Sequence, residues 1–287
     1  MWRNFLFMLA GCIPVTVLIV FVFADRWRCK QAGERPPQQE KLLRPAGYSL
    51  NLRLADLGDD FSSWMIGAYL TTLVSVGIIS LYPSNDRTTQ TIVFIVFSLG
   101  AAVCTVLAWR KVMEIRKVRL GLLGEQSVAE QLQTLLAKGY RVFHDIPGDG
   151  KWNIDHVAVG PAGVFAIETK SRTKRPGKAG ERDHEAEFDG KAIRFPSGYD
   201  DKAPAQARRN AKWLANMLSK STGKRVTVQP IVALPGWWVT LKADSDVKVL
   251  NGKQVPGFIA AEPPKLSSDV IDPIAYQLEQ RCRDVEF

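Results

Sequence analysis

Three long apolar runs constrain this chain more than any other feature of its sequence. They cover residues 5–24, 64–82 and 91–109, and none of them contains a charged residue. A helix needs about 20 predominantly apolar residues to cross the hydrocarbon core of a bilayer. Buried core helices can pass the same length criterion, but three uncharged runs together favour transmembrane spans. The sequence therefore predicts an α-helical membrane region with three spans within residues 1–120.

The distribution of Lys and Arg around these runs predicts their orientation. One basic residue, Arg3, precedes the first run, whereas four follow it before residue 36. Further basic residues follow the third run, between residues 110 and 119. Because Lys and Arg are enriched in cytoplasmic loops, we predict an N-terminus outside, a polar connector inside over residues 25–63, and a cytoplasmic C-terminal domain. The expected location is the inner (plasma) membrane of a bacterium.

The first run has an alternative interpretation as a cleaved signal peptide. The segment Val22-Phe23-Ala24 is similar to a signal-peptidase site. A signal peptide carries its positive charge before the apolar run, however, and here the charge follows it. Cleavage would also leave two spans and place the basic residues after the third run on the wrong side of the membrane. We therefore favour a retained first span.

The net charge of +9 is a topology signal more than a nucleic-acid footprint. Residues 1–120 hold 14 of the 38 Lys and Arg but 8 of the 29 Asp and Glu, so they carry +6 and the remaining chain carries +3. Basic residues beside a span attract anionic lipids. We expect residues 110–120 to form a basic juxtamembrane helix that extends the third span, with residues 110–119 in contact with the anionic headgroups of the lipid bilayer.

Cysteine and histidine do not predict a metal site. The four cysteines, Cys12, Cys29, Cys104 and Cys282, form no C-x-x-C pair, and the three histidines have no H-x-x-x-H spacing. Neither a zinc site nor a disulfide framework is therefore indicated. If the chain binds a metal, carboxylates must hold it.

From residue 121 the apolar pattern changes to short alternating elements. Apolar residues at helical spacing predict helices over residues 123–138 and 204–220. Period-two runs bounded by turn residues predict strands. Residues 121–287 are therefore expected to form a mixed α/β domain with a central mixed sheet flanked by helices. The predicted strands cover residues 140–144, 153–159, 164–170, 226–234 and 247–259, the last segment being broken at Asn251-Gly252 and at Pro256.

Two further segments of this domain have signals of their own. Asp189-Gly190 is a strong short-range hairpin signal and predicts a hairpin within residues 186–195. Residues 171–185 are polar and rich in lysine, and we expect them to form a mobile loop.

The strands over residues 153–159 and 164–170 are joined by a sequence typical of a turn. Its residues are Gly160-Pro161-Ala162-Gly163. If this turn closes a hairpin with an even-length loop, Val159 pairs with Val164. The register of the whole ribbon then follows, because each residue away from the turn opposes its counterpart on the other strand.

This register brings two acidic residues together. Counting back by equal steps places Asp155 opposite Glu168, and the period of two puts Lys170 on the same face. Directly opposed residues have Cβ atoms about 4.5–5.5 Å apart, a distance at which two carboxylates repel each other. Two exposed carboxylates, each served by a nearby lysine, are the alternative interpretation. A cation between Asp155 and Glu168 removes the repulsion, so the pair predicts a metal site.

A divalent cation with oxygen ligands suits this pair. Mg²⁺, or Mn²⁺, binds to one or two carboxylates together with water and substrate phosphate. The predicted ligands are Asp155, Glu168 and the main-chain carbonyl of Thr169. Lys170 can contact the attacking water or the phosphate. Since such a cation polarises a phosphate and lowers the pKa of a bound water, the predicted chemistry is phosphodiester hydrolysis.

Two predicted helices can complete the site. Glu125 lies three residues before Val128 on the apolar stripe of the first helix, and a buried carboxylate there needs a partner. On the second helix Gln206 and Asn210 are four residues apart and share one face, where their amides can orient water or phosphate. Glu125 alone is equally typical of a helix cap or a solvated helix surface, and Gln206 and Asn210 alone are more typical of a helix surface, so their weight comes from the set.

Three other features have simpler interpretations. His156 falls on the opposite strand face from Asp155 and is expected to be a core histidine rather than a catalytic base. Trp237-Trp238 can stack on bases, although a strand end or a protein contact is the favoured explanation of the pair. The basic residues of segment 170–182 can bind phosphates, and a solvated loop is an equal alternative.

Together these residues resemble the nuclease-related (NERD) domain of the PD-(D/E)xK nuclease superfamily. The resemblance covers residues 121–234 and omits the apolar runs. It implies a restriction-endonuclease-like core in which Asp155 and Glu168 hold metal, Lys170 assists, and Glu125 and Gln206 support. The segment 171–185 departs from the pattern and leaves the substrate contacts open. The resemblance rests on Gly124-Glu125, Asn153-Ile154-Asp155-His156, Ile167-Glu168-Thr169-Lys170, and Gln206 with Asn210.

The sequence as a whole predicts a membrane-anchored, Mg²⁺-dependent endonuclease at the cytoplasmic face. Its expected substrate is nucleic acid, DNA in the first place, and a homo-oligomer is compatible with the sequence. Two other functions remain open. One is a nucleic-acid-binding or signalling module that keeps the fold without turnover, and the other is a membrane scaffold that binds other proteins. The complete set of two acids and a lysine favours the nuclease.

Overall fold

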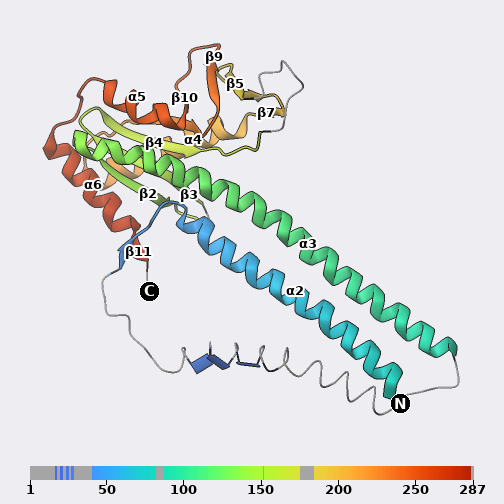
Figure 1. The fold of residues 1–287 in the computed structure, drawn as a ribbon. Coiled ribbons are helices and arrows are strands. Elements are labelled where there is room, and N and C mark those ends of the chain that lie inside the picture. The colour runs from blue at the N-terminus through green and yellow to red at the C-terminus, as the bar shows by residue number, and fades with distance from the viewer. Residues whose placement is uncertain are drawn as a thin grey trace. The chain divides into compact units, whose positions relative to one another are not determined.

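A computed structural model describes residues 41–81, 87–150, 152–174 and 184–285, together with a few single positions between residues 17 and 28 (Figure 1). Among the described residues, one compact unit contains residues 56–115, and a second contains residues 41–55 and 116–285. Residues 56–115 are helical wherever they are described, and the second unit is a mixed α/β domain.

Two long helices make up residues 56–115. They are parts of α2 (Tyr48–Leu81) and α3 (Arg87–Leu132). Within this unit the two helices lie side by side (Figure 1) and are joined by a salt bridge of 2.6 Å between Lys111 and Asp60. Because one partner lies early in the unit and the other late, the helices run antiparallel.

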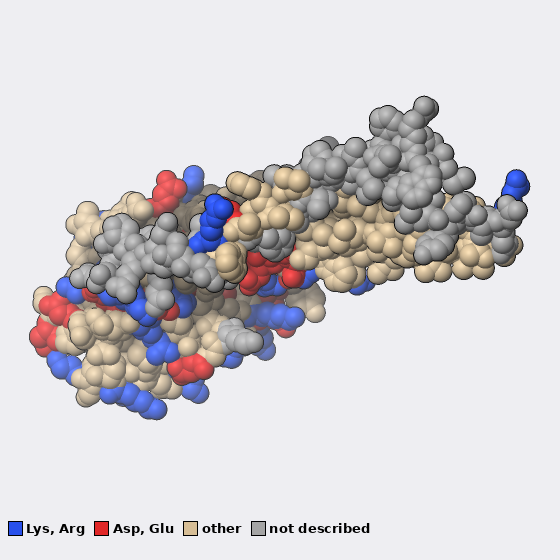
Figure 2. Space-filling view, turned by 90° about the horizontal axis from the view of Figure 1, so that it is seen from below, with Lys and Arg blue, Asp and Glu red and all other residues tan. Residues whose placement is uncertain are grey.

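Within the described residues, two helices and not three are long and apolar enough to cross a membrane. Only 6% of the most apolar 18-residue stretch of each is buried, and the visible surface of these helices carries few charged residues (Figure 2). The second and third apolar runs fall on α2 and α3. The first run, residues 5–24, lies outside the described residues except for single positions. The prediction of three spans is therefore corrected to two long apolar helices.

α2 begins earlier than its apolar run does. Residues 48–63, which the sequence predicts as part of a polar connector, form the beginning of this helix. Leu, Arg and Ala dominate residues 50–55, and all three are good helix formers. Residues 110–120, predicted as a basic helix, lie within α3.

The core of the second unit is a five-stranded mixed sheet in the order β10-β8-β4-β3-β2. β2, β3 and β4 are antiparallel neighbours, whereas β4, β8 and β10 are parallel to one another. The predicted mixed sheet is therefore confirmed. The strands are β2 (Arg141–Pro147), β3 (Asn153–Gly160), β4 (Gly163–Thr169), β8 (Val228–Leu234) and β10 (Lys248–Asn251).

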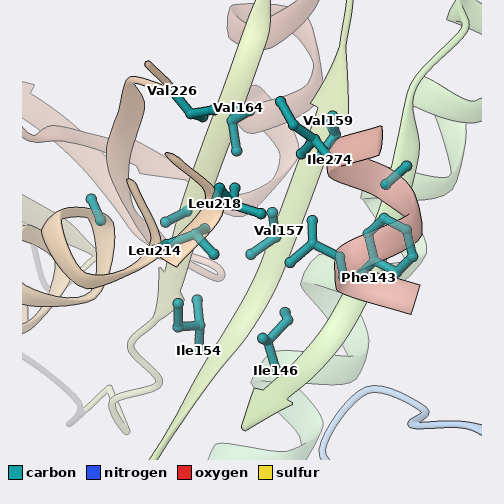
Figure 3. Close-up of a cluster of buried hydrophobic side chains, with 14 of the residues drawn as sticks. Phe143, Ile146, Ile154, Val157, Val159, Val164, Leu214, Leu218, Val226 and Ile274 are labelled. Atoms are coloured by element: carbon teal, nitrogen blue, oxygen red, sulfur yellow. The ribbon is translucent and has the colours of Figure 1, made fainter. Parts of the chain in front are cut away.

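Helices cover both faces of this sheet. On one face Leu214 and Ile274 pack against Val157 and its neighbours (Figure 3). On the other face Leu132 and Ile259 pack against the opposite side of the same strands. The helices of the first face are α4 (Lys202–Thr222) and α6 (Ser268–Cys282), and those of the second are the end of α3, the 3-10 turn η1 (Gln133–Lys138) and α5 (Val255–Ala261).

A smaller sheet of four strands, in the order β7-β6-β5-β9, packs beside the start of α4. The hairpin predicted at Asp189-Gly190 joins β5 to β6 and is confirmed. The carboxylate of Asp189 accepts hydrogen bonds from the amides of Lys191 and Ala192, and Gly190 adopts φ +90, which favours glycine. The strands are β5 (Glu185–Phe188), β6 (Ile193–Phe195), β7 (Gly198–Asp200) and β9 (Trp238–Leu241).

The prediction of strands after residue 247 was only partly correct. Only residues 248–251 form a strand there, and the rest of the predicted strand is the 3-10 turn η2 (Gly252–Gln254) followed by α5. Asn251 caps this turn with its side chain, and Pro256 stands in the first turn of α5, where proline is tolerated. Helix α6 was not predicted at all, although its apolar residues recur at helical spacing; it contains Pro273, a residue that disfavours a helix interior.

Residues 41–55 belong to the α/β domain, although they precede the apolar helices in sequence. Strand β1 (Leu42–Leu43) pairs with β11 (Arg283–Val285). Arg44 donates from Nε to Asp284 at 2.7 Å and from Nη1 to the buried carboxylate of Asp145 at 3.0 Å. Ser49 donates a second hydrogen bond of 2.7 Å to the same carboxylate. This segment therefore supplies the counter-charge for a buried acid of the sheet.

We predict that Arg44→Gln lowers the free energy of unfolding by about 3 kcal/mol, because removing one partner leaves the buried charge of Asp145 uncompensated. The measurement is denaturant unfolding of the full chain in detergent. Arg141→Gln is the matched control, since its salt bridge with Asp272 lies on the surface and such pairs contribute about 0–1 kcal/mol. Equal losses in the two variants would contradict the assignment.

Candidate active site

The hairpin that carries the two acids has the predicted register. Val159 pairs with Val164, and Gly160 pairs with Gly163 across the turn. The paired residues run back to His156 and Ile167. Asp155 and Glu168 stand one step beyond this last pair, at the end of the β3–β4 ribbon.

The side chain of Asp155 does not simply follow the alternation of the strand. Ile154 and Val157 are three residues apart, yet both pack into the cluster under α4 and α6. The neighbouring strand is irregular as well, because Asp145 has φ +52, a conformation that is rare outside glycine. A hydrogen bond fixes the Asp155 carboxylate: the amide of Thr169 donates to its Oδ2 at 2.6 Å. The Asp155 carboxylate therefore lies against the peptide that follows Glu168.

Gly124 lets α3 approach the end of β4 closely. A Cβ added to Gly124 would overlap the side chain of Ser171 and lie 3.5 Å from Cγ2 of Thr169. Glu125 follows on the same helix, and its Oε2 is buried with no hydrogen-bond partner among the described residues. Oγ1 of Thr169 and Oγ of Ser171 are also buried without a partner in that part of the chain. Buried polar groups normally have hydrogen bonds, so these oxygens mark a site for a polar ligand.

Glu168 is held from the other side of the sheet by α4. Nδ2 of Asn210 donates to Oε2 of Glu168 at 3.1 Å, and both residues are buried. Gln206, one turn earlier on α4, also forms a side-chain hydrogen bond with Glu168. The amide pair that the sequence placed on one helix face therefore orients a carboxylate.

Burial and mutual repulsion raise the pKa values of three carboxylates. Glu125, Asp155 and Glu168 are 7, 7 and 8% exposed. Burial, followed by the charges of Asp155 and Asp145, raises the pKa of Glu125 to about 9. Burial raises the pKa of Asp155 to about 7 against the opposing hydrogen bond from Thr169. Burial and the charge of Asp155 raise the pKa of Glu168 well above its ordinary value. The three groups therefore form one electrostatic cluster, the acidic cluster.

Lys170 lies beside this cluster, but its ammonium group contacts a different acid. Nζ of Lys170 is 3.2 Å from Oδ2 of Asp200, and the lysine side chain is 41% exposed. Its charge nevertheless lowers the pKa values of Asp155 and Glu168 against the effect of burial. Asp200 also accepts hydrogen bonds from the first amides of α4. Asp200 was not among the predicted site residues, although an Asp just before a predicted helix is a capping signal.

His156 is a core residue, as the sequence indicated. Its ring is fully buried, and its Nδ1 lies 2.9 Å from Nδ1 of His144 on β2. Burial lowers the pKa of His144 to about 4 and lowers that of His156 well below its usual value. Both rings are therefore neutral near pH 7, but they are too weakly basic to be good candidates for a general base at the acidic cluster.

The donor set of the acidic cluster fits a hard divalent cation. No three side chains of His, Cys, Asp or Glu converge on one point within the described ranges. Mg²⁺, however, commonly uses one or two carboxylates and completes its shell with water and substrate oxygens. Asp155 and Glu168 can supply two such carboxylates, and Oε2 of Glu125, which has no partner among the described residues, can accept a further hydrogen bond. Coordination by the Thr169 carbonyl stays a prediction.

Comparison with known proteins identifies the region around this cluster. Residues 120–235 match the family model of the nuclease-related domain, NERD. This segment runs from the end of α3 to the end of β8 and contains every member of the acidic cluster. No curated protein and no solved structure shows significant similarity to the chain.

We predict that Mg²⁺ stabilises the protein more strongly at about pH 8 than at about pH 5.5. Carboxylates with raised pKa values stabilise the fold while protonated, and this contribution is lost as the pH rises through 7 to 9. Bound Mg²⁺ restores it at high pH, whereas at low pH the cation competes with protons. At a cation concentration 100 times Kd the gain is about 2.7 kcal/mol. The readout is the thermal midpoint of the full chain in detergent, with and without Mg²⁺.

Glu168→Gln should abolish this pH-dependent gain. The exposed Glu187, which forms a salt bridge with Lys242, provides the matched control Glu187→Gln, which should keep the gain. Stabilisation of equal size in both variants would show that the cation binds elsewhere.

Proposed function

We propose that this chain, whose residues 120–235 match the nuclease-related domain, is a divalent-metal-dependent nuclease that hydrolyses phosphodiester bonds in nucleic acid, with DNA as its substrate. One observation carries the proposal: three buried carboxylates, Glu125, Asp155 and Glu168, share one electrostatic cluster. Such an arrangement is unfavourable for folding alone. It is typical of sites where charge is needed for chemistry.

In this proposal Asp155 and Glu168 hold Mg²⁺ or Mn²⁺, and the Thr169 carbonyl adds a further oxygen. The metal, when bound, supplies Lewis acidity that polarises the scissile phosphate and lowers the pKa of a coordinated water. The hydrogen bond from the Thr169 amide keeps the Asp155 carboxylate in place. The hydrogen bond from Asn210 does the same for Glu168.

Glu125 and Lys170 have separate tasks in the proposed reaction. The Oε2 atom of Glu125, which has no partner among the described residues, can accept a hydrogen bond from an ordered water and hold it near the phosphate. Lys170 exchanges Asp200 for a phosphate oxygen, and its ammonium group then stabilises the charge that develops in the transition state. Gln206 supports Glu168 from α4.

We also propose that α2 and α3 anchor the domain in a bacterial inner membrane. Both are long and apolar enough to span it, and the basic residues 110–119 suit contact with anionic headgroups. The distribution of Lys and Arg favours a cytoplasmic nuclease-related domain. A nuclease held there would meet DNA that enters the cell.

A second candidate function has one observation in its favour. Nζ of Lys170 forms its salt bridge with Oδ2 of Asp200, at 3.2 Å, and not with a carboxylate of the acidic cluster. If this salt bridge persists when nucleic acid is bound, Lys170 does not reach the phosphate, and the domain binds nucleic acid without turnover. We rank this function second, since the three carboxylates of the acidic cluster, the amides that bind them and Lys170 are all present for the proposed reaction.

We predict that the full chain in detergent cleaves plasmid DNA with Mg²⁺ and loses this activity in excess EDTA. Glu168→Gln and Lys170→Met should each lower the rate at least about 100-fold, which corresponds to about 2.7 kcal/mol of transition-state stabilisation. Agarose-gel assays of nicked and linear products measure the rate.

Glu187→Gln and Lys242→Met, which break an exposed ion pair of the same domain, are the matched controls and should cleave at the wild-type rate. Cleavage that survives Glu168→Gln would remove the site assignment. DNA binding without cleavage by the wild-type chain would favour the second candidate function, and neither binding nor cleavage would favour a scaffold.

We further predict that green fluorescent protein fused after residue 287 is fluorescent in a bacterial host and that alkaline phosphatase fused there is inactive. This pattern requires a cytoplasmic C-terminus. The fusion should also stay with the membranes after an alkaline carbonate wash, because spanning helices are not released by it. A soluble fusion, or an active phosphatase, would contradict the proposed topology.

A further inference from the structure

A pocket opens beside the acidic cluster, and two tryptophans line it. Its volume is about 480 Å³, and its walls are the side chains of Trp152, Gln206, Arg209, Asn210 and Trp213. We call it the tryptophan pocket. Two of its walls, Gln206 and Asn210, are the amides that hold Glu168. The pocket therefore shares a wall with the proposed catalytic centre, while the tryptophans and Arg209 have no part in that centre.

Trp213 is fixed in one orientation by its neighbours. Its Nε1 donates to Asp149 at 2.7 Å. The guanidinium group of Arg281 lies 4.9 Å from the centre of its ring and also donates to Asp149 at 2.7 Å. One face of the Trp213 ring is thus occupied by a cation, and the indole is a rigid wall.

Trp152 is held in place by the turn that carries it. The amide of Gly148 donates to the carbonyl of Trp152 at 2.9 Å. A Cβ added to Gly148 would overlap the ring of Trp152, so the ring lies directly on the glycine. Its ring meets that of Trp213 at 4.8 Å and 81°. Trp152 nevertheless remains 37% exposed. The Trp152 indole is therefore ordered by its contacts and partly exposed to solvent at the mouth of the pocket.

Arg209 gives this pocket a positive charge. Its side chain is exposed and forms no salt bridge with any residue in the described ranges. It follows Gln206 by three residues and precedes Trp213 by four, so the three side chains share one face of α4. An aromatic plate and an unpaired cation next to acidic groups are complementary to a nucleotide, whose base stacks and whose phosphate is anionic.

We propose that the tryptophan pocket binds one unpaired nucleotide next to the scissile phosphate, with the base stacked on Trp152 and its phosphate contacted by Arg209. This inference rests on the proposed nuclease function. A base inside a duplex exposes only its edges in the grooves, and it must leave the stack before an indole can cover its face. The substrate class is therefore single-stranded or locally unpaired nucleic acid, such as frayed ends, flaps and gaps.

The test measures binding separately from cleavage. The full chain with Glu168→Gln, in detergent and with Ca²⁺ in place of Mg²⁺, is titrated into a short fluorescein-labelled single-stranded oligonucleotide and into its duplex. Fluorescence anisotropy gives both Kd values. We expect the single strand to bind at least about tenfold more tightly than the duplex.

In the same background Trp152→Ala should weaken single-strand binding about tenfold, within the range of loss when a base loses its aromatic partner. Trp152→Phe should restore most of this loss, because the ring face is kept. Gly148→Ala should weaken binding as well, since its methyl group displaces the indole without removing it. Trp238→Ala is the matched control: Trp238 is 62% exposed on β9 and lies outside the pocket. Arg209→Gln should weaken binding and reduce its salt dependence by about one charge.

The outcomes separate this inference from the proposed function. If the wild-type chain cleaves single strands and duplexes equally, and Trp152→Ala does not change this cleavage, the proposed role of the tryptophan pocket is wrong and the proposed nuclease function is kept. Single-strand binding that depends on Trp152, without cleavage by the wild-type chain, supports the pocket and overturns the nuclease. Equal losses for Trp152→Ala and Trp238→Ala, or no binding of either oligonucleotide, overturn the pocket.

Discussion

Four carboxylates are buried at one end of the central sheet, and the arrangement of their partners governs the rest of the α/β domain. Asp145 is fully buried but neutralised, because Arg44 and Ser49 bind its carboxylate. Asp155 and Glu168 each accept a hydrogen bond from an amide, and the charge of Lys170 lowers the pKa values of these two residues. Oε2 of Glu125 has no hydrogen-bond partner among the described residues. One acid is therefore neutralised by groups of the protein itself, whereas the other three lie buried with raised pKa values.

The position of Arg44 shows why the family match does not define the folded unit. The match begins at residue 120, yet residues 41–55 belong to the same compact unit and provide a strand as well as this arginine. Asp145 raises the pKa values of Glu125 and Asp155. The salt bridge that neutralises Asp145 thus also reduces the negative charge that the acidic cluster experiences. A segment far away in the sequence contributes to the electrostatics of the site.

The hairpin could be predicted from sequence because its register depends on a local turn. Gly160 and Gly163 close the loop, and the pairs follow by counting. The direction of Asp155 could not be predicted in the same way, because strict alternation fails where Asp145 adopts φ +52. The partner of Lys170 was missed for a related reason: Asp200 belongs to a second sheet that only the tertiary fold brings near. The register of the ribbon could be predicted from a local pattern, whereas the residues around the ribbon are brought there by long-range contacts.

Helix α4 explains how a stable fold can keep such a site in order. Its buried face packs Leu214 and Leu218 into the core, while Asn210 points to Glu168 and Trp213 to the tryptophan pocket. Positions on a packed helix cannot move independently, so the helix itself sets the spacing between Asn210, which binds Glu168, and Trp213, which lines the pocket. A loop in this place would need further contacts to keep the same geometry. The carboxylate and the pocket are therefore fixed relative to each other before any ligand arrives, which lowers the ordering cost of binding.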